Sequence, residues 1–436
     1  MLFGKQGRAK VHVESFNGEP ISLAKGLTST ALHGDFVELR ILPPKKKKFD
    51  RRKKKFSEQK ARYEVRKIIR RNTKDFLGYL KKDGGRFLVE AENSRLFIPF
   101  KILGDARKGN PGDKVVAQFS RWDPPAKIPT CKILRVLGPG GEAQTDHLGI
   151  LAKFGLSAKF PHKVEEEAKA VANSLTKADL KHRVDYRNIF TITIDPLDAR
   201  DFDDALSLKS INDDIWEVGV HIADVSHYVR ENSSIDREAK KRGNSTYLVD
   251  EVVPMLPHSL SSGICSLIEG EERLTKCVLF RFGPKGEILK SEIVESVIKS
   301  DKRLTYEQAI LFLQSNSLVQ IKSAKPPPSR YSGNPGKSLQ ELDDQFLTKI
   351  ENAIQRLWSF AASLRKKRFQ QGALKLDSGD IKILVDANGE PEEILHSEND
   401  ESHQLVEELM LLANETIAKE FRKKSLPGIF RVHPDP

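Results

Sequence analysis

The chain has 436 residues, 38% hydrophobic and 31% charged, which is enough for about three domains of roughly 150 residues with buried cores. No stretch approaches the roughly 20 consecutive apolar residues of a membrane-spanning helix, and the first ten residues lack an apolar signal-peptide centre, so we expect a cytoplasmic protein. Cys131, Cys265 and Cys277 are odd in number and have no CxxC spacing, which argues against disulfides or a zinc site and predicts buried thiols.

The excess positive charge lies at the N-terminus. Residues 1–72 hold 20 Lys and Arg against 7 Asp and Glu, within totals of 73 and 61 for the sequence. Nine of these basic residues lie between Lys45 and Lys55. Such a block stays solvated unless a polyanion neutralises it, and nucleic-acid phosphates reward neutralisation by releasing counterions. This basic arm therefore favours a nucleic-acid partner; a linker without a specific role and an acidic membrane surface are the alternatives.

Two small β-barrels are predicted in the first third of the chain. Residues 27–42 and 74–90 share short alternating strands, and HGDFVEL (33–39) and PGDKVVAQF (111–119) look like one element that occurs twice. About five strand-like runs between residues 75 and 137 predict an OB-type barrel. Residues 1–26 show too few clear strands, so the first barrel is expected to be incomplete.

The second predicted barrel interleaves aromatic rings with cations. The rings Phe87, Phe97 and Phe100 fall on strand-like stretches, and the flanking cations are Arg86, Arg95 and Lys101. This pattern is typical of surfaces that stack single-stranded bases. Core packing is the alternative for each ring, because a small barrel must bury several of its aromatics.

The remaining chain alternates helical and strand patterns. The Gly-rich stretch 137–146 is expected to be a linker, and residues 161–175 have the apolar spacing of a helix. Residues 341–371 and 402–424 read as long amphipathic helices, and the Pro-, Ser- and Lys-rich insert at 322–338 is expected to be a surface loop. With strand-like runs around the acidic stretch described next, the C-terminal half is predicted to be mixed α and β.

Residues 191–209, TITIDPLDARDFDDALSLK, crowd aspartates together: Asp195, Asp201, Asp203 and Asp204, with Asp198 between them. On a strand, Asp201 and Asp203 would share one face, and Asp195 could fold back toward them from the preceding strand. Carboxylates this close stay ionised only if a cation compensates them, and a run without Cys or His favours Mg²⁺ or Mn²⁺ over zinc. An EF-hand calcium loop fits badly, because Arg200 stands where that loop needs glycine. A solvated acidic loop without metal is the alternative.

An acidic metal centre in a chain with a basic arm predicts phosphodiester hydrolysis. Two cations about 4 Å apart would activate water and stabilise the leaving 3′ oxygen, with the carboxylates holding the ions.

Four segments, in this order, resemble a known family: TIDPLDARDFDDALSL, GVHIADVSHYV, STYLVDEVVPMLPHSLSSGICSL and LVEELMLLANETIA. Over roughly residues 27–436 they resemble the ribonuclease II and ribonuclease R (RNB) exoribonucleases, the bacterial ribonuclease R branch most. The resemblance implies a multidomain fold, with N-terminal cold-shock or OB-type β-barrels followed by a mixed α+β RNB catalytic domain. The implied domains are a partial cold-shock domain with the basic arm (1–60), a second one (72–138), a linker and helical segment (139–180) and the RNB domain (181–436).

The resemblance also implies an activity and its residues. It implies a Mg²⁺-dependent 3′-to-5′ exoribonuclease, with Mn²⁺ as the other cofactor, that degrades single-stranded RNA processively to nucleoside 5′-monophosphates by a two-metal mechanism. By position, the metal-binding and catalytic aspartates of the family match Asp195, Asp201, Asp203 and Asp204. Aromatics at the RNA 3′ end match Tyr247 and Tyr306, and a carboxylate near the terminal ribose matches Glu407 or Glu408. The retained RNA-stacking ring of the barrel is Phe87. Ordinary core packing for the tyrosines and a solvated helix face for the glutamates are the alternatives. A monomer is expected, and association with the ribosome or the RNA-decay machinery is left open.

The chain departs from the family pattern in three places. The first barrel is abbreviated, GRFLV replaces a Gly-Phe-Gly-Phe pattern in the second, and the chain ends at GIFRVHPDP. The family continues through an arginine-bearing Ser-Pro-Ile-Arg-Arg-Tyr-like segment and a C-terminal OB-type domain, so we expect an incomplete catalytic domain. Two rival hypotheses are a catalytically impaired RNA-binding protein that keeps the barrels and aspartates, and a different Mg²⁺-dependent phosphotransfer enzyme.

Overall fold

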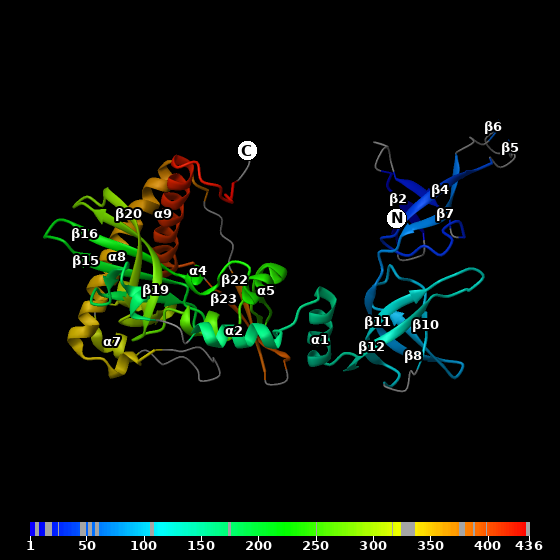
Figure 1. Cartoon of the computed structure of the whole chain (residues 1–436), viewed down its shortest axis with the longest axis horizontal. Helices are drawn as coiled ribbons and strands as arrows, with labels where there is room; N and C mark the ends of the chain where they lie inside the picture. The colour runs from blue at the N-terminus through cyan, green and yellow to red at the C-terminus, as the bar shows by residue number, and fades with distance from the viewer. Residues whose placement is uncertain are drawn as a thin grey trace. The chain divides into compact units, whose positions relative to one another are not determined.

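The computed structural model describes residues 1–4, 8–13, 20–24, 26–43, 49–50, 55–56, 61–104, 109–172, 176–249, 251–315, 317–323, 336–374, 380–386, 389–397 and 399–432. The chain forms two compact units, one of Met1–Ser157 with Val385–Glu392 and one of Ala158–Leu384 with Glu393–Pro436 (Figure 1). The basic block and the insert at 322–338 lie mainly outside the described residues, so the expectations about them stay predictions.

The first unit begins with short paired strands. β1 (Leu2–Phe3), β2 (Ala9–Val11) and β3 (Ile21–Leu23) form an antiparallel sheet, β4 (Phe36–Leu42) pairs with β7 (Arg62–Arg70), and β5 (Phe49–Asp50) pairs with β6 (Lys55–Phe56). Phe3, Val11, Leu23 and Val65 share one small core. Strands of two or three residues are too short to show alternation, so the three strands before residue 27 were not clear in the sequence. The described strands of this region form separate small sheets and not one closed barrel, in line with the expected incomplete barrel.

A closed five-stranded barrel follows, as predicted. Its strands are β8 (Asp75–Asp83), β9 (Arg86–Ala91), β10 (Phe100–Ile102), β11 (Asp113–Arg121) and β12 (Thr130–Pro139), joined in the order β10-β12-β11-β8-β9. The β10–β12 pair is parallel and the others are antiparallel. Leu80, Val89, Phe100 and Val115 are fully buried inside it.

The predicted repeat of one element is visible as two turns of the same build. Gly34 and Gly112 have φ of 86° and 98°, a region that glycine enters without steric cost. In each turn the next residue, Asp35 or Asp113, accepts a hydrogen bond on Oδ2 from the backbone N–H three residues earlier, at 2.7 Å. A long strand, β4 or β11, starts at once after each turn.

The expected linker at 137–146 is largely structured. β12 extends to Pro139, and α1 (Ala143–Phe154) begins a few residues later and packs on the barrel. Of the glycines that suggested a linker, Gly138 lies near the end of β12 and Gly141 in the turn that follows, and both have positive φ.

The second unit is built on a seven-stranded mixed sheet. Its strands are β13 (Val184–Tyr186), β14 (Thr191–Asp195), β15 (Asp204–Ser210), β16 (Trp216–Ala223), β19 (Glu272–Phe282), β20 (Ile288–Lys299) and β21 (Lys302–Thr305), in the order β13-β20-β19-β16-β15-β14-β21. The β13–β20 and β14–β21 pairs are parallel, and the other neighbours are antiparallel.

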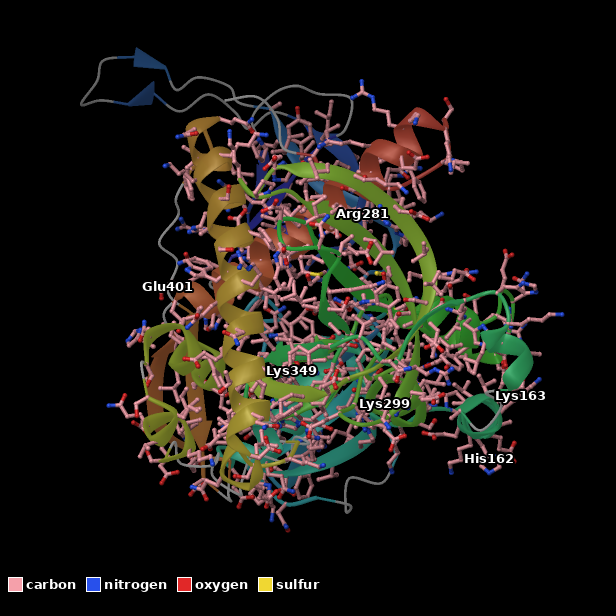
Figure 2. The ribbon with its side chains drawn as sticks, turned by 90° about the vertical axis from the view of Figure 1, so that its left-hand side faces the viewer. His162, Lys163, Arg281, Lys299, Lys349 and Glu401 are labelled. Atoms are coloured by element: carbon pink, nitrogen blue, oxygen red, sulfur yellow. The ribbon has the colours of Figure 1, made fainter. Side chains whose placement is uncertain are left out.

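Helices cover both faces of this sheet. On one face Val220 and Phe280 pack with α6 (Tyr306–Gln314), α8 (Asp344–Gln370) and α9 (Glu401–Lys423). Figure 2 labels Lys349 on α8, whose Nζ lies 4.6 Å from the ring centroid of Phe190 beside the sheet. On the other face Cys277 packs with α2 (His162–Ala172), α5 (Ser234–Arg242) and η1 (Ser259–Ile264). The sheet is therefore the middle layer of a three-layer α/β unit.

The remaining elements are short, apart from one hairpin. They are α3 (Lys177–Leu180), α4 (Val225–Tyr228), β17 (Thr246–Tyr247), β18 (Val252–Val253), α7 (Leu318–Ser323), η2 (Leu339–Glu341), β22 (Asp380–Val385) and β23 (Pro391–Ser397). The helices predicted at 161–175, 341–371 and 402–424 are confirmed as α2, α8 and α9, and all three cysteines are buried as predicted. Among the described helices, none combines the length and apolar character needed to cross a bilayer.

Candidate active site

The aspartate cluster lies at one edge of the sheet, where β14 ends and β15 begins. Asp195 is the last residue of β14 and Asp204 is the first residue of the antiparallel neighbour β15. Asp201 and Asp203 lie on the loop between these strands, so the expected strand through them is wrong. The strand ladder starts only at Asp204.

A buried phenylalanine, Phe202, nevertheless separates two aspartates that are not buried, as the alternation of side chains predicted. Phe202 is 1% exposed, its N–H donates to Ser266 Oγ at 3.0 Å, and its carbonyl accepts from the N–H of Leu267 at 2.9 Å. In an extended segment neighbouring side chains point to opposite sides. Phe202 is buried in the core, whereas neither of its neighbours, Asp201 and Asp203, is buried.

The pKa values show that the aspartates interact with one another. Burial and, as the second cause, the charge of Asp204 together raise the pKa of Asp195 to about 7. Burial, with the charge of Asp203, raises the pKa of Asp204 to about 6. Desolvation and the charge of Asp201 raise the pKa of Asp203. The structure therefore brings all four predicted aspartates into one electrostatic group.

The donor chemistry of this group fits a hard divalent cation. Asp195 Oδ2 is buried and has no hydrogen-bond partner, which is costly for a carboxylate unless a cation or a proton meets it. Within the part of the chain that is described, no three acidic, histidine or cysteine side chains converge closely enough to hold one metal ion. Mg²⁺ is commonly held by one or two carboxylates, with water and substrate phosphate oxygens completing its coordination. A Mg²⁺ or Mn²⁺ ion at these aspartates stays a prediction.

A buried arginine that the sequence analysis missed lies against this group. Arg303 on β21 is 1% exposed, and its Nη2 donates to the Pro196 carbonyl at 2.7 Å. Its guanidinium lies 5.3 Å from the ring centroid of Phe202 and interacts with the charge of Asp195. Nε and Nη1 have no hydrogen-bond partner among the described residues. The only local signal in the sequence is the pair of adjacent cations, Lys302 and Arg303, in KRLT, and it does not show that the strand is buried.

Tyr247 presents an exposed ring beside the aspartates. It lies on β17, is 67% exposed, and has its pKa raised by partial burial and by the charges of Asp201 and Asp203. An exposed tyrosine ring near an acidic group is suited to stacking on a base. The core-packing alternative is wrong for Tyr247, and its contact with RNA stays a prediction.

Tyr306 reaches the same group from the helical face. It is the first residue of α6, is half-buried, and has its pKa raised by burial and by the charges of Asp204 and Asp195. Its ring stacks on His403 of α9, with centroids 3.8 Å apart and an interplanar angle of 13°. The sequence analysis did not find His403, because a contact between two distant helices leaves no local pattern.

Glu407 and Glu408 are fixed by arginines of α8. Glu408 is 3% exposed and pairs with Arg365 at 3.2 Å and with Arg368. The Glu407 side chain is 39% exposed and pairs with Arg368 at 3.3 Å. The alternative of a solvated helix face is therefore wrong for Glu408, and a role for either residue near a ribose stays a prediction.

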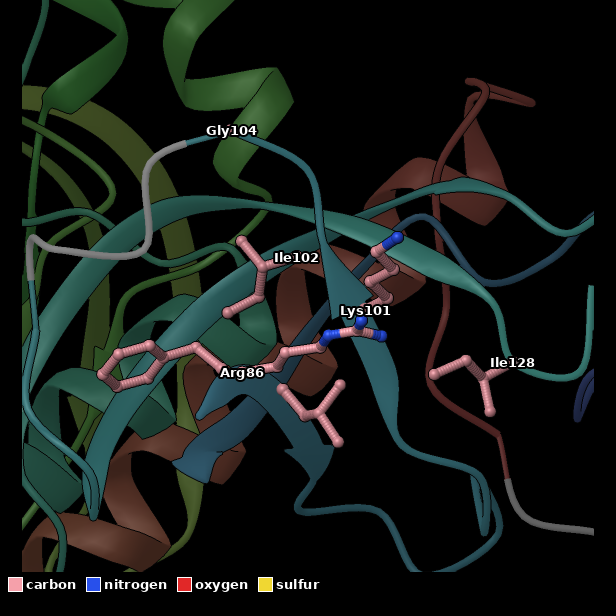
Figure 3. Close-up of a pocket in the computed structure, with 7 residues that line it drawn as sticks. Arg86, Lys101, Ile102, Gly104 and Ile128 are labelled. Atoms are coloured by element: carbon pink, nitrogen blue, oxygen red, sulfur yellow. The ribbon is translucent and has the colours of Figure 1, made fainter. Parts of the chain in front are cut away.

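The second barrel carries a shallow cavity of about 260 Å³ lined by Arg86, Phe87, Lys101, Ile102 and Ile128, among others (Figure 3). Phe87 is half-buried at this cavity, so its ring is available for stacking, and its contact with RNA stays a prediction.

The other two rings proposed for stacking belong to cores. Phe100 is fully buried in the barrel, and Phe97 lies outside any strand with its ring 5.3 Å from that of Phe3. Core packing, the alternative considered, therefore explains both.

Two protein-family models match the chain. The RNB domain matches residues 183–436, and the cold shock domain matches residues 89–161. A ribonuclease R of Thermotoga maritima is 36% identical over 379 residues, which are 86% of this chain and 50% of that protein. Ribonuclease R 2 of Lactococcus lactis is 34% identical over 424 residues, 95% of this chain and 59% of that protein. The chain thus spans half to three fifths of the length of these relatives.

Solved structures share the fold. RNase R of Mycoplasma genitalium, in complex with ribose-methylated single-stranded RNA, matches with a TM-score of 0.80 and 24% identity, covering 100% of this chain and 63% of that one. Yeast Ssd1, described as a pseudonuclease, matches with a TM-score of 0.59 and 17% identity, covering 97% of this chain and 54% of that one.

Proposed function

The chain belongs to the RNB-domain family of ribonuclease R proteins, and from this premise we propose that it is a 3′-to-5′ exoribonuclease that acts on single-stranded RNA. We propose further that it is processive and releases nucleoside 5′-monophosphates. Asp195, Asp201, Asp203 and Asp204 would hold Mg²⁺ or Mn²⁺, two ions in the family mechanism, which would supply Lewis-acid stabilisation of charge on the phosphodiester.

One observation carries this proposal: two tyrosines flank the four coupled aspartates. Tyr247 offers an exposed ring near Asp201 and Asp203, and Tyr306 lies near Asp195 and Asp204. An acidic group bordered by aromatic rings suits the end of a nucleotide chain, because the rings stack on bases while the carboxylates face the phosphate through a cation. A solvated acidic loop would explain neither the burial of Asp195 nor the placement of the rings.

The surrounding residues have separable roles in this proposal. Arg303 holds the turn after β14 through the Pro196 carbonyl, and so orients Asp195. Tyr247 and Tyr306 bind and orient the 3′-terminal nucleotides. Phe87, Arg86 and Lys101 on the barrel add affinity for the strand through stacking and phosphate contacts. We propose a monomer, and association with the ribosome or the RNA-decay machinery as a further partner.

A second candidate function is RNA binding without hydrolysis. The described residues contain no group of three ligands that converges on one metal ion, which is compatible with this candidate and, because one or two carboxylates can hold Mg²⁺, also with the first. The fold is also compatible with it, since Ssd1 shares the fold and is described as a pseudonuclease.

An assay with 3′-end-labelled single-stranded RNA and Mg²⁺ separates the two candidates. We expect release of labelled mononucleotide, loss of release on chelation, and a fall of about 100-fold or more in Asp203→Asn. Asp213→Asn, in the exposed β15–β16 turn, is the matched control and should match the unaltered chain. RNA binding without release would favour the second candidate, and turnover of DNA but not RNA would contradict both.

A further inference from the structure

His403 occupies a fixed position at the start of α9. Asp400 caps this helix, accepting on Oδ1 from the backbone N–H groups of Ser402 at 3.0 Å and His403 at 3.3 Å. The same oxygen lies 2.8 Å from Nδ1 of His403. An ionised carboxylate only accepts hydrogen bonds, so Nδ1 carries the proton and the imidazole plane is set by the helix cap.

Tyr306 is fixed on its backbone by a second cap but needs a neighbour to fix its ring. Thr305 Oγ1 accepts from the N–H of Gln308 at 3.1 Å, and the Gln308 side chain accepts from the N–H of Thr305 at 3.0 Å. This capping box defines the start of α6 at Tyr306. Thr305 is also the β21 partner of Asp195, which places the start of α6 at the edge that carries the aspartates.

The imidazole of His403 is the surface on which the Tyr306 ring lies. The centroids are 3.8 Å apart and the planes are 13° from parallel. Asp400 and His403 come from α9, whereas Tyr306 comes from α6, so the stack joins two caps on separate elements.

We propose that His403, oriented by Asp400, is a positioning residue that holds the Tyr306 ring against the carboxylate group. This inference rests on the proposed role of Tyr306 at the RNA 3′ end. His403 acts through Tyr306 and does not itself contact the reacting atoms. A ring held in place loses no rotamer freedom when RNA binds, and displacement of a positioning group by about 1 Å can cost about 100-fold in rate.

Replacement of the ring separates positioning from simple packing. We expect His403→Ala to lower kcat on 3′-labelled RNA about 10- to 100-fold with a smaller change in KM. His403→Phe keeps a planar ring and should restore most of this loss, whereas Asp400→Asn should give an intermediate loss. His162→Ala, at an exposed position on α2 whose side chain is 86% exposed, is the control.

A double variant provides the decisive comparison. If His403 acts through Tyr306, then Tyr306→Ala combined with His403→Ala should be no slower than Tyr306→Ala alone. Additive losses, or a failure of His403→Phe to restore activity in a chain with unchanged thermal unfolding, would overturn the proposal.

Two further measurements keep this test independent of hydrolysis. In spectra of carbon-13-labelled histidine, the stacked His403 ring should resonate upfield, and Tyr306→Leu should remove the shift. If the unaltered chain binds RNA but does not hydrolyse it, the proposed exoribonuclease function fails while the positioning inference stays testable. In that case His403→Ala and Tyr306→Ala should weaken binding of a single-stranded RNA equally, and unchanged affinity in both would overturn the inference.

Discussion

Asp195 shows how a residue of the proposed metal site can lower the stability of the fold. It is 7% exposed, one of its oxygens has no hydrogen-bond partner, and its pKa is raised to about 7 by burial and by Asp204. A carboxylate in this environment lowers stability whenever it is ionised. Such a residue persists in a fold when its charge is used, and here a cation is the counterpart that we propose.

Asp195→Asn is therefore expected to stabilise the metal-free chain at alkaline pH. The folded pKa near 7 exceeds the value of about 3.9 for an unfolded Asp, so this group favours folding below pH 4 and loses that contribution as pH rises through 7. In EDTA at pH 8 we expect the asparagine variant to gain about 1–3 kcal/mol in free energy of unfolding, with little gain at pH 4. Urea unfolding at both pH values measures this, and a gain that is the same at both would contradict the argument.

At the scale of single elements, the sheet contains a buried histidine. His221 on β16 is fully buried, with Nε2 2.9 Å from Ser207 Oγ of β15 and Nδ1 3.2 Å from Ser296 Oγ of β20. Burial lowers its pKa to about 3. The imidazole is therefore neutral in the folded chain and joins three strands through hydroxyl groups.

His221 is expected to lower the stability of the chain as the pH falls, whereas Asp195 lowers it as the pH rises. An unfolded His takes up a proton near pH 6.5, whereas His221 in the folded chain does so only near 3, so its contribution to stability is lost as pH falls below 6.5. Relative to the unaltered chain, His221→Asn should become more stable by up to about 3 kcal/mol between pH 6.5 and 4. Denaturant unfolding across this range measures the difference, and a constant difference would show that His221 titrates normally.

The contact between α8 and α9 predicts different outcomes for two adjacent glutamates. Removal of one partner of a buried ion pair leaves an uncompensated charge and costs about 3–5 kcal/mol, whereas exposed pairs contribute about 0–1 kcal/mol. Glu408→Gln should therefore destabilise the chain by about 3 kcal/mol because Arg365 and Arg368 lose a buried partner. Glu407→Gln, at a side chain 39% exposed, should cost less than about 1 kcal/mol. Equal losses of unfolding free energy in the two variants, measured by thermal or urea unfolding, would show that the buried ion pair contributes no more to stability than the exposed one.

Elements with a strong local pattern were predictable, and contacts between elements were not. The long helices and the five-stranded barrel follow from apolar periodicity, and the aspartate motif is compact enough to be read from a single stretch. The strand expected through Asp201 and Asp203 was wrong because the same alternation of buried and unburied residues also occurs in a loop held by Phe202. The sequence left Phe97 and Phe100 open between base stacking and core packing, because no local signal separates a core ring from an exposed one, and the structure decides for core packing. His403 and Arg303 act across the fold, so only the structure shows them.

At the scale of the whole molecule, the two compact units differ in the chemistry that they would offer to a polynucleotide. The second unit, which carries the RNB domain, has the coupled aspartates at which we propose a cation. The first unit, called the barrel unit below, has an apolar cavity bordered by Arg86 and Lys101. An acidic site by itself repels RNA. We therefore expect the barrel unit to contribute a measurable part of the affinity while leaving the chemistry at the aspartates unchanged.

The ring and the cations of that cavity should contribute to RNA binding in distinguishable ways. Stacking of a base on an aromatic ring is worth about 1–3 kcal/mol and depends little on salt, so Phe87→Ala should weaken binding about equally at 50 and 200 mM salt. Phosphate contacts release counterions, so Arg86→Gln and Lys101→Gln should each lower the slope of log Kd against log salt by about 0.7. Fluorescence anisotropy with single-stranded RNA measures both, and Lys163→Gln on α2 is the matched control for loss of a surface charge (Figure 2).

Two outcomes would contradict this argument. If Phe87→Ala changed only the salt slope, the ring would act through its cationic neighbours. If none of the three variants changed binding, the cavity would lie off the path of the RNA. A salt-independent loss of affinity in Phe87→Ala, together with lower salt slopes in Arg86→Gln and Lys101→Gln, would establish that the barrel binds the strand by stacking as well as by charge. The net positive charge of the chain does not by itself distinguish these two modes of binding.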